Sequence, residues 1–526
     1  MDSSRLKIIL FITLASFFAL YLGIAAATAQ MKALSWIVGG LFLAVCIGLG
    51  KHVWILIPAT LSMKGGVNFL PGQIPPWVFM TAATGCLFLL RAAIRRQTVF
   101  FKWTWMETAI ALVALSIVQA IVRNPVGLQA LGGDRAGSKP YFIFIFAFAA
   151  YYIIVASRPG LKEWKWAVIL FATFGIMDGL IQAISGLYPS FAMIMGKIYT
   201  NVSYNEAMGQ GDGYDLSESR LMFLTQIGSI LGLIACSYWR PLSAINLFKP
   251  WRALTIGLAL ICILLSGFRG TMAALFVRFC MGSVIRRHYL DVLVIFLIGI
   301  LGVTFIAFSG LSKDLPFGIQ RVLSALPIPL ELSSAARTNA EGSSQDRFDM
   351  WKAALTGDRY IQNKVLGDGF QFSAVEVKAM GEAALPDSPL NKLPWIDRAL
   401  EMGVYHGFHV ETIRFTGVVG LFAATLALII FMRYAWRSID LLRDTPIWGH
   451  VIFMCLPFVI YPFWYWFIFG SYRDGFPELL ALAAMVRASY DLGLLHHGVL
   501  ATEKTSEAGA KFSRMPPMRR PAPQGL

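Results

Sequence analysis

Charged residues are scarce in this chain. Asp, Glu, Lys and Arg make up 14% of the 526 residues, whereas soluble domains carry roughly a quarter. Hydrophobic residues make up 57%, and the mean hydropathy is +0.62. Apolar runs of about 17–25 residues recur along the chain, and each is long enough to cross a bilayer as a helix. The scarcity of charge therefore excludes an ordinary soluble protein and predicts a membrane protein.

The apolar runs also lack the alternation of polar and apolar residues that marks the strands of a membrane barrel. The sequence predicts an all-α polytopic membrane protein with about 12–14 transmembrane helices and a large periplasmic loop. Pro58 and Gly65-Gly66 in the third candidate span allow a broken or re-entrant helix there. The candidate spans are, approximately, 8–28, 34–50, 53–69, 76–93, 104–122, 139–156, 165–186, 219–238, 253–267, 270–285, 290–309, 411–432, 449–469 and 475–491.

Cysteine is also infrequent. The six cysteines all lie in apolar segments, and none has CxxC spacing. Such cysteines are typical of small buried hydrophobic residues, which excludes a disulfide framework and a cysteine-ligated metal. HExxH and similar zinc signatures are missing as well. We therefore expect neither a metal nor another cofactor.

Acidic residues are outnumbered by basic ones, 30 to 45, which gives a net charge of +15. A nucleic-acid partner could explain such a balance. The basic residues instead fall in alternate short loops, where Lys and Arg mark the cytoplasmic side. We therefore expect contact with the lipid bilayer and none with nucleic acid. With the N-terminus inside, the inner loops hold Arg91, Arg95, Arg96, Lys102, Arg158, Lys162, Lys165, Arg240, Lys249, Arg252, Arg286, Arg287, Arg433, Arg437 and Arg443.

The first apolar segment follows Arg5 and Lys7 and ends in AAATAQ, which resembles a signal-peptidase site. Its apolar run of about 20 residues is longer than the usual signal core of roughly 7–15. We favour an uncleaved first helix, and cleavage would leave all later topology unchanged. Both termini are then predicted to be cytoplasmic.

The predicted topology divides the chain into five regions. From about residue 503 the tail is basic, rich in proline and poor in large apolar groups, so we expect disorder there. The chain shows no internal repeat, which weakens a transporter built on inverted repeats. The regions are N-terminal transmembrane helices (1–218), transmembrane helices of a second group (219–309), a periplasmic loop (310–410), C-terminal transmembrane helices (411–491) and a cytoplasmic tail (492–526).

The large loop is predicted to contain a short helix in SSQDRFDMWKAALTG. Ser343 and Asp346 have the spacing of a capping box at its start, and Gly357 is a natural stop. Arg347 and Trp351 are four residues apart and hence on one face. Two interpretations stay open. Trp351 anchors an amphipathic helix at the membrane surface, or Arg347 offers forked donors to a phosphate.

Two of the seven histidines, His406 and His409, lie in YHGFHVETIRFTGVVG, where the loop leads into a span that starts near Glu411. The topology places both outside the cytoplasm and the other five inside or at the inner surface. If the segment is helical, the two imidazoles share a face. A lone histidine is usually structural, but an outer pair at the start of a helix favours a functional site.

Each of the other polar residues on the outer side has two possible interpretations. In LLSGFRGTMAAL, Arg269 occupies a tight glycine-flanked turn between two spans, where it either binds lipid headgroups or faces an anionic ligand. Arg220, after DGYDLSES, and Arg473, in GSYRDG, are either charged caps or ligand-binding cations. Asp178 lies in the outer half of its span, and we expect it to face a cavity or pair with a cation.

Three segments, in this order, resemble the O-antigen ligase and O-antigen polymerase family, which are integral-membrane glycosyltransferases of the GT-C type. LLSGFRG is similar to the family's Ser-x-x-Arg-Gly turn. QDRFDMWKAAL followed by VLGDGFQFS (365–373) resembles its Arg-x-x-x-Trp helix and glycine-rich turn. HGFHVETIRFTGVVGLF (406–422) resembles its histidine-rich start of a span, which closes in Thr-Gly-x-x-Gly. The likeness covers about 220–435.

The chain departs from that pattern at two places. Gly407 stands where the family usually has Asn or Ser, and LMFLTQIG replaces the Asn-Pro-Asn-like stretch often found after the arginine that corresponds to Arg220. The resemblance therefore does not assign a definite role to Arg220, and it does not identify the acceptor of the saccharide.

The resemblance implies that Arg269 and Arg347 hold the pyrophosphate of a polyprenyl-linked glycan. It also implies that His406, eleven residues before Gly417, is the essential histidine. His406 then either deprotonates the acceptor hydroxyl or, when protonated, binds phosphate. A metal is not needed, which fits the lack of a DxD-like cluster on the outer side. The substrate-binding candidates are Arg220, His409, Trp351, Arg473 and Asp178.

The expected function is transfer or polymerisation of saccharide from a polyprenyl diphosphate-linked donor to a glycan or lipid-linked acceptor. The resemblance implies that this occurs at the periplasmic face of the bacterial inner membrane, in O-antigen or exopolysaccharide assembly. The alternative is a lipid-linked glycan flippase or another multi-span transporter, which predicts ionisable groups along a central pathway open to both sides. A third possibility is a sensory or assembly subunit without catalysis.

Overall fold

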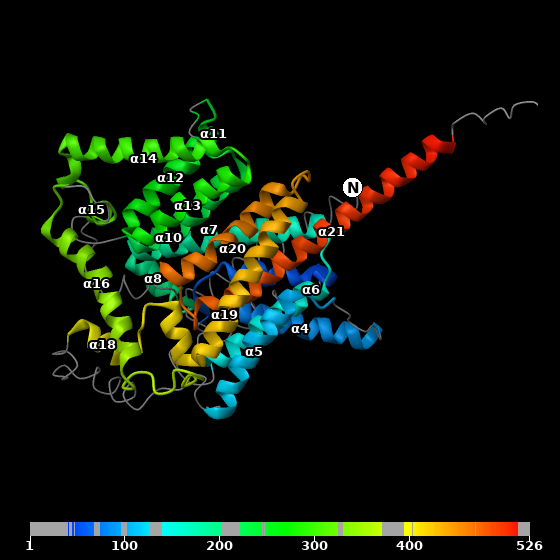
Figure 1. The fold of residues 1–526 in the computed structure, drawn as a ribbon, viewed down its shortest axis with the longest axis horizontal. Coiled ribbons are helices and arrows are strands. Elements are labelled where there is room, and N and C mark those ends of the chain that lie inside the picture. The colour runs from blue at the N-terminus through cyan, green and yellow to red at the C-terminus, as the bar shows by residue number, and fades with distance from the viewer. Residues whose placement is uncertain are drawn as a thin grey trace, which may run out of the picture.

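The computed structural model places α-helices over most of the chain that it describes (Figure 1). The only strands in the described residues are the two-residue pair β1 (Gly66–Val67) and β2 (Tyr199–Thr200), which are antiparallel. The described residues are 40, 45–46, 48–67, 74–95, 102–125, 139–200, 221–244, 246, 248–324, 330–370, 394–401, 403–468 and 470–513.

Eight described helices are long and apolar enough to cross a membrane, which confirms the predicted fold class of an all-α polytopic membrane protein. Two shorter apolar helices, α10 (Thr225–Tyr238) and α12 (Pro250–Ser266), accompany them. The eight are α4 (Pro76–Arg95), α5 (Trp105–Arg123), α6 (Lys139–Ala156), α7 (Leu161–Leu187), α14 (Tyr289–Ser309), α19 (Phe408–Leu441), α20 (Trp448–Phe467) and α21 (Gly475–Ser513).

Shorter elements connect and flank these helices. The helix α13 (Arg269–Ile285) follows α12 after a turn at Gly267, whose φ of 69° lies in the left-handed region. The helix α16 (Ser334–Thr356) belongs to the predicted large loop. The remaining elements are η1 (Gly50–Ile55), α3 (Leu56–Leu61), α8 (Pro189–Met195), η3 (Met222–Leu224), α11 (Pro241–Ala244), η4 (Leu311–Lys313), α15 (Phe317–Leu323) and α18 (Trp395–Glu401).

The core lies among α5, α6, α19, α20 and α21, whose inward side chains form one continuous apolar cluster. Trp164 of α7 joins this core and donates its Nε1 proton to the carbonyl of Met485 in α21, at 3.0 Å. In contrast, α14 leaves large apolar side chains such as Leu301 and Phe305 more than half exposed. Such exposure suits a helix that contacts lipid chains.

Loops that the charge pattern predicts to be outside gather at one end of the bundle. There Arg123 donates to the carbonyl of Gly367 at 2.7 Å, and the β1–β2 pair joins two further predicted outer segments. We call this the histidine end, defined by the start of α13, the start of α19, the start of α21 and the helix α16. The predicted outer segments thus share one end although they are distant in sequence.

Predicted inner loops gather at the opposite end. Arg286 donates to the carbonyl of Ser237 at 2.6 Å, which joins the ends of α13 and α10. Arg443 donates to the carbonyl of Ile285 at 3.3 Å, which adds the end of α19. The fold therefore separates the two sets of loops as the positive charges predict.

The candidate span 53–69 is broken. The helical segment η1–α3 ends at Leu61, and the chain then turns into strand β1 at the histidine end. The hydroxyl of Tyr199 accepts a hydrogen bond from the backbone N–H of Gly65 at 2.6 Å, which holds this turn. The helix therefore stops before the glycine pair, and the segment is a broken helix, as one of the two sequence interpretations holds.

One predicted boundary, the start of the loop helix, is wrong. The helix α16 begins at Ser334, nine positions before Ser343, and its N-cap is Ser333, whose side chain accepts from the backbone of Ala336. The stop at Gly357 is confirmed. The helix α21 continues to Ser513, beyond the expected start of disorder, and projects away from the bundle (Figure 1). Ala, Glu and Lys are frequent in its last turns and favour a helix.

The glycine-rich turn and the Thr-Gly-x-x-Gly segment form one structure. Residues 363–370 lie along residues 414–419, and four backbone hydrogen bonds join them. The N–H of Gly369 donates to the carbonyl of Phe415 at 3.0 Å. The N–H of Val418 donates to the carbonyl of Lys364 at 2.9 Å. We call this paired segment the clasp. It provides partners for backbone groups that are left free where α19 is interrupted.

Gly417 interrupts α19 with φ 74° and ψ −176°, a conformation that is essentially limited to glycine. A Cβ on Gly417 would overlap the carbonyl of Val365. Arg414, one turn earlier and 1% exposed, lies 3.4 Å from the carboxylate of Asp368 and so ties the same two segments together. The clasp thus fixes the first turns of α19, which precede the kink and carry His409.

Candidate functional site

The helix α16 carries Arg347 and Trp351 one turn apart, as the sequence predicts. Trp351 donates its Nε1 proton to the carbonyl of Tyr405 at 3.1 Å. Arg347 reaches the other way and donates to the carbonyl of Ile468, where α20 ends, at 3.4 Å. One face of α16 therefore contacts both the histidine segment and the turn between α20 and α21.

The turn that carries His406 is held on both sides. Before it, the Tyr405 side chain is buried, and its hydroxyl lies 3.4 Å from the carbonyl of Tyr360. After it, Gly407 packs against the indole of Trp351 so closely that a Cβ would lie 2.6 Å from Nε1. His406 itself has a φ of 46°, in the left-handed region. The departure from the family pattern at Gly407 thus coincides with close packing against Trp351.

His406 and His409 would share a face only if both were helical, and that condition is not met. Gly407 is the extended N-cap of α19, and the helix begins at Phe408. His406 therefore lies in the preceding turn, and only His409 is helical. The glycine that fits against Trp351 also delays the start of the helix.

Arg269 lies at the start of α13, close to the same turn as Arg347. Its neighbour Gly270 faces Ile468 and Trp464, since a Cβ at Gly270 would lie 3.6 Å from the Ile468 side chain. Arg347 donates to the carbonyl of that same Ile468. Two arginines that are far apart in sequence thus meet at the end of α20.

The cluster of Arg269, Arg347 and His406 is strongly cationic. Burial lowers the pKa of Arg269 from its ordinary value, and the charge of Arg347 lowers it further. Burial also lowers the pKa of Arg347. Within the part of the chain that the structure describes, neither guanidinium has a carboxylate within ion-pair distance. Two partly buried guanidinium groups with no carboxylate partner among the described residues form a site suited to phosphate oxygens.

His406 is electrically coupled to this pair. Burial lowers the pKa of His406 below its ordinary value, and the positive charge of Arg347 lowers it further. The neutral imidazole is therefore the dominant form at neutral pH. A neutral imidazole can accept a proton, which favours the base role over the phosphate-binding role in the unliganded site.

His409 lies between two tryptophans. Its ring meets Trp351 edge to face, with ring centroids 4.5 Å apart, and stacks on Trp466 with centroids 5.9 Å apart. Its Nδ1 is buried and, among the described residues, has no hydrogen-bond partner. His409 therefore links α16, α19 and α20 beside the cationic cluster.

Arg473 lies in the turn before α21 and is engaged by an acidic neighbour. It forms two hydrogen bonds of 3.0 Å to the carboxylate of Asp474. The same turn is tied to α19, because Glu411 accepts from the Ser471 hydroxyl at 2.9 Å and from the backbone of Tyr472 at 2.8 Å. Arg473 is therefore near the cluster in the fold, but its charge is paired.

Asp178 belongs to a separate network at the histidine end. Its carboxylate is fully buried and accepts from the hydroxyl of Tyr199 at 2.6 Å and from Gln182 at 2.8 Å. The backbone N–H of Lys64 also donates to it at 3.2 Å. These bonds hold the turn after α3, so the structure gives Asp178 an architectural role. Arg220 lies outside the described residues.

Two features of the site have no clear signal in the sequence. Trp466 stacks on His409 from a helix that is apolar throughout, so nothing local marks it. Ile468 contributes a backbone carbonyl, which any residue could supply. No protein-family model matches this chain, and no curated protein matches it.

Proposed function

We propose that this chain is an integral-membrane glycosyltransferase that transfers or polymerises saccharide from a polyprenyl diphosphate-linked donor. The reaction takes place at the histidine end, which we assign to the periplasmic side of the bacterial inner membrane, with both termini cytoplasmic. The product enters surface polysaccharide assembly, as O-antigen or exopolysaccharide. The observation that carries the proposal is the meeting of Arg269 and Arg347 beside His406, with no carboxylate partner for either guanidinium among the described residues.

The charge that develops on the leaving diphosphate accounts for the role of the two arginines. When the bond between the anomeric carbon and the diphosphate oxygen breaks, the bonding electrons stay with the diphosphate. Arg269 and Arg347 stabilise this developing charge with donors that are already in place. Fixed donors of this kind typically contribute about 3–4 kcal/mol each in enzymes. The reaction then needs no metal.

The imidazole explains how the acceptor becomes a nucleophile. The acceptor hydroxyl attacks the anomeric carbon, a new C–O bond forms, and its proton passes to neutral His406. His406 is presented by a turn that Trp351 and Gly407 fix, so the base is positioned before the substrate binds.

Analysis of the carrier-linked glycan in cells that lack this protein tests the proposal. We expect polyprenyl diphosphate-linked glycan to accumulate on the periplasmic side while long-chain surface glycan is lost. Single repeat units would identify a polymerase, and completed chains on the carrier would identify a ligase. Accumulation confined to the cytoplasmic leaflet would instead identify a transporter, and unchanged surface glycan would contradict a role in its assembly.

A further inference from the structure

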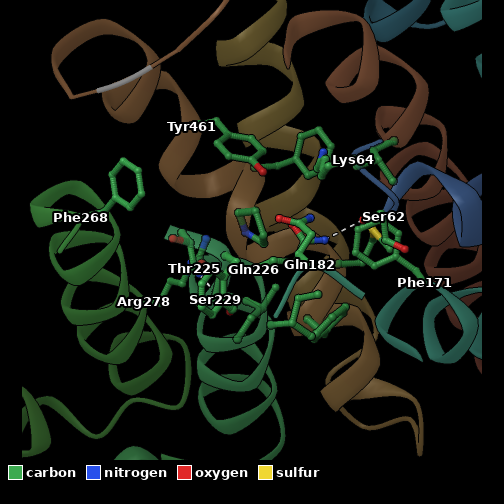
Figure 2. A pocket seen from close by; sticks show the side chains of 18 of the residues that line it. Ser62, Lys64, Phe171, Gln182, Thr225, Gln226, Ser229, Phe268, Arg278 and Tyr461 are labelled. Atoms are coloured by element: carbon green, nitrogen blue, oxygen red, sulfur yellow. Dashed lines mark hydrogen bonds between the residues drawn. The ribbon is translucent and has the colours of Figure 1, made fainter. Parts of the chain in front are cut away.

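A cavity of about 590 Å³ lies inside the helical bundle, apart from the cationic cluster. Its walls come from α7, α10, α13, α20 and α21, together with the turn after α3 (Figure 2). The volume falls within the roughly 300–1,000 Å³ of typical ligand sites. Arg269, Arg347 and His406 do not line it, and Phe268 is the lining residue nearest to them in sequence. The cavity is therefore a second candidate binding site, separate from the cationic cluster.

The lining is divided by chemistry. Phenylalanines such as Phe171, Phe453 and Phe458, with Leu482, supply apolar walls. A polar strip consists of Thr225, Gln226, Ser229, Gln182 and Tyr461 (Figure 2). Such a lining accepts a molecule that is largely apolar and has one polar end.

The cation that faces this strip is Arg278, near the middle of α13. Its Nη1 donates to the carbonyl of Ser229 at 3.3 Å. No carboxylate among the residues that the structure describes lies within ion-pair distance of it. The other cavity cation, Lys64, differs because it is paired with Glu478. Among the described residues that line the cavity, Arg278 is thus the cation without an anionic partner.

The depth of Arg278 indicates the kind of anion. It lies nine residues after Arg269, which corresponds to about 13 Å along a helix axis at 1.5 Å per residue. A buried cation inside a bundle of apolar helices is costly without a partner and usually marks a binding site. A ligand that enters from the bilayer would bring its own apolar chain to the phenylalanine walls.

We propose that this cavity binds a phosphate-bearing lipid, with the phosphate on Arg278 and an apolar chain along the phenylalanine walls. Ser229 supplies a hydroxyl donor to the same phosphate. The inference does not rest on the proposed glycosyltransferase activity, because none of the proposed catalytic residues lines the cavity. Its failure would leave that activity untouched.

Native mass spectrometry of the full-length protein in a neutral detergent tests the inference. The probes are phosphatidic acid, diacylglycerol with the same chains, and inorganic phosphate. We expect phosphatidic acid to stay bound, diacylglycerol to be lost, and Arg278→Gln to weaken phosphatidic acid binding at least 10-fold. Arg278→Lys restores most of the binding, since it restores the charge. Lys352→Gln, an exposed charge change on α16, is the matched control.

A second variant tests the inference even if Arg278→Gln does not fold. Ser229→Phe narrows the cavity from α10 and leaves Arg278 in place, and we expect it to exclude phosphatidic acid. Equal binding of phosphatidic acid by the wild type, Arg278→Gln and Ser229→Phe would overturn the inference. Equal retention of diacylglycerol would also overturn it. Full competition by inorganic phosphate alone would refute the lipid assignment.

Discussion

Arg347→Ala is expected to reduce the release of polyprenyl diphosphate from a carrier-linked glycan by about 100-fold or more. Arg347 acts electrostatically on both other members of the cluster, since its charge lowers the pKa of Arg269 and that of His406. The substitution therefore removes a cation from the leaving diphosphate. The rate is measured with purified protein and carrier-linked glycan, by quantifying polyprenyl diphosphate.

Lys352→Ala is the matched control, because it removes one positive charge from the same helix at an exposed position. It should keep the wild-type rate. Arg347→Lys should fall between the two, because an ammonium keeps the charge but lacks the forked donors of a guanidinium. A wild-type rate in Arg347→Ala would remove Arg347 from the mechanism. An equal loss in Lys352→Ala would mean that the effect reflects general charge and not the site.

Gly417→Ala is expected to destabilise the protein by about 3 kcal/mol or more. Placing a non-glycine residue at φ 74° and ψ −176° costs on the order of 1–3 kcal/mol by itself. The added Cβ would also overlap the carbonyl of Val365, so the clasp must open and lose backbone hydrogen bonds worth about 0.5–1.5 kcal/mol each. Unfolding in mixed detergent micelles measures the change.

Gly310→Ala provides the comparison. Gly310 also has a positive φ, 69°, but a Cβ there would meet no atom within 4 Å. Gly310→Ala should lower the free energy of unfolding only by the cost of placing alanine at a positive φ, about 1–2 kcal/mol. If Gly417→Ala were no more destabilising than Gly310→Ala, the clasp would contribute nothing to stability.

Features that depend on local composition could be predicted from the sequence. The spans follow from apolar length, and the two ends of the bundle follow from the distribution of Lys and Arg. The four-residue spacing of Arg347 and Trp351 predicts a shared face of α16, and both side chains are used there. The end of that helix at Gly357 also follows from the local sequence.

Features that depend on tertiary contact could not be predicted. Nothing in the sequence indicates that Gly407 packs against Trp351 and is the N-cap of α19, which places His406 before the helix and His409 within it. The clasp joins two motifs that are far apart along the chain, so neither motif alone indicates the other. The hydrogen bond from Tyr199 to Asp178 likewise depends on tertiary contact, because it joins strand β2 to α7.

The most direct test compares single substitutions with their combination. Arg269→Ala, Arg347→Ala and His406→Ala are assayed separately and together for polyprenyl diphosphate release, with folding checked in each. Groups that act as one unit show strongly non-additive losses, so each single variant should be nearly as inactive as the triple variant. Losses that simply multiply, or a single variant with the wild-type rate, would contradict a shared site at the end of α20.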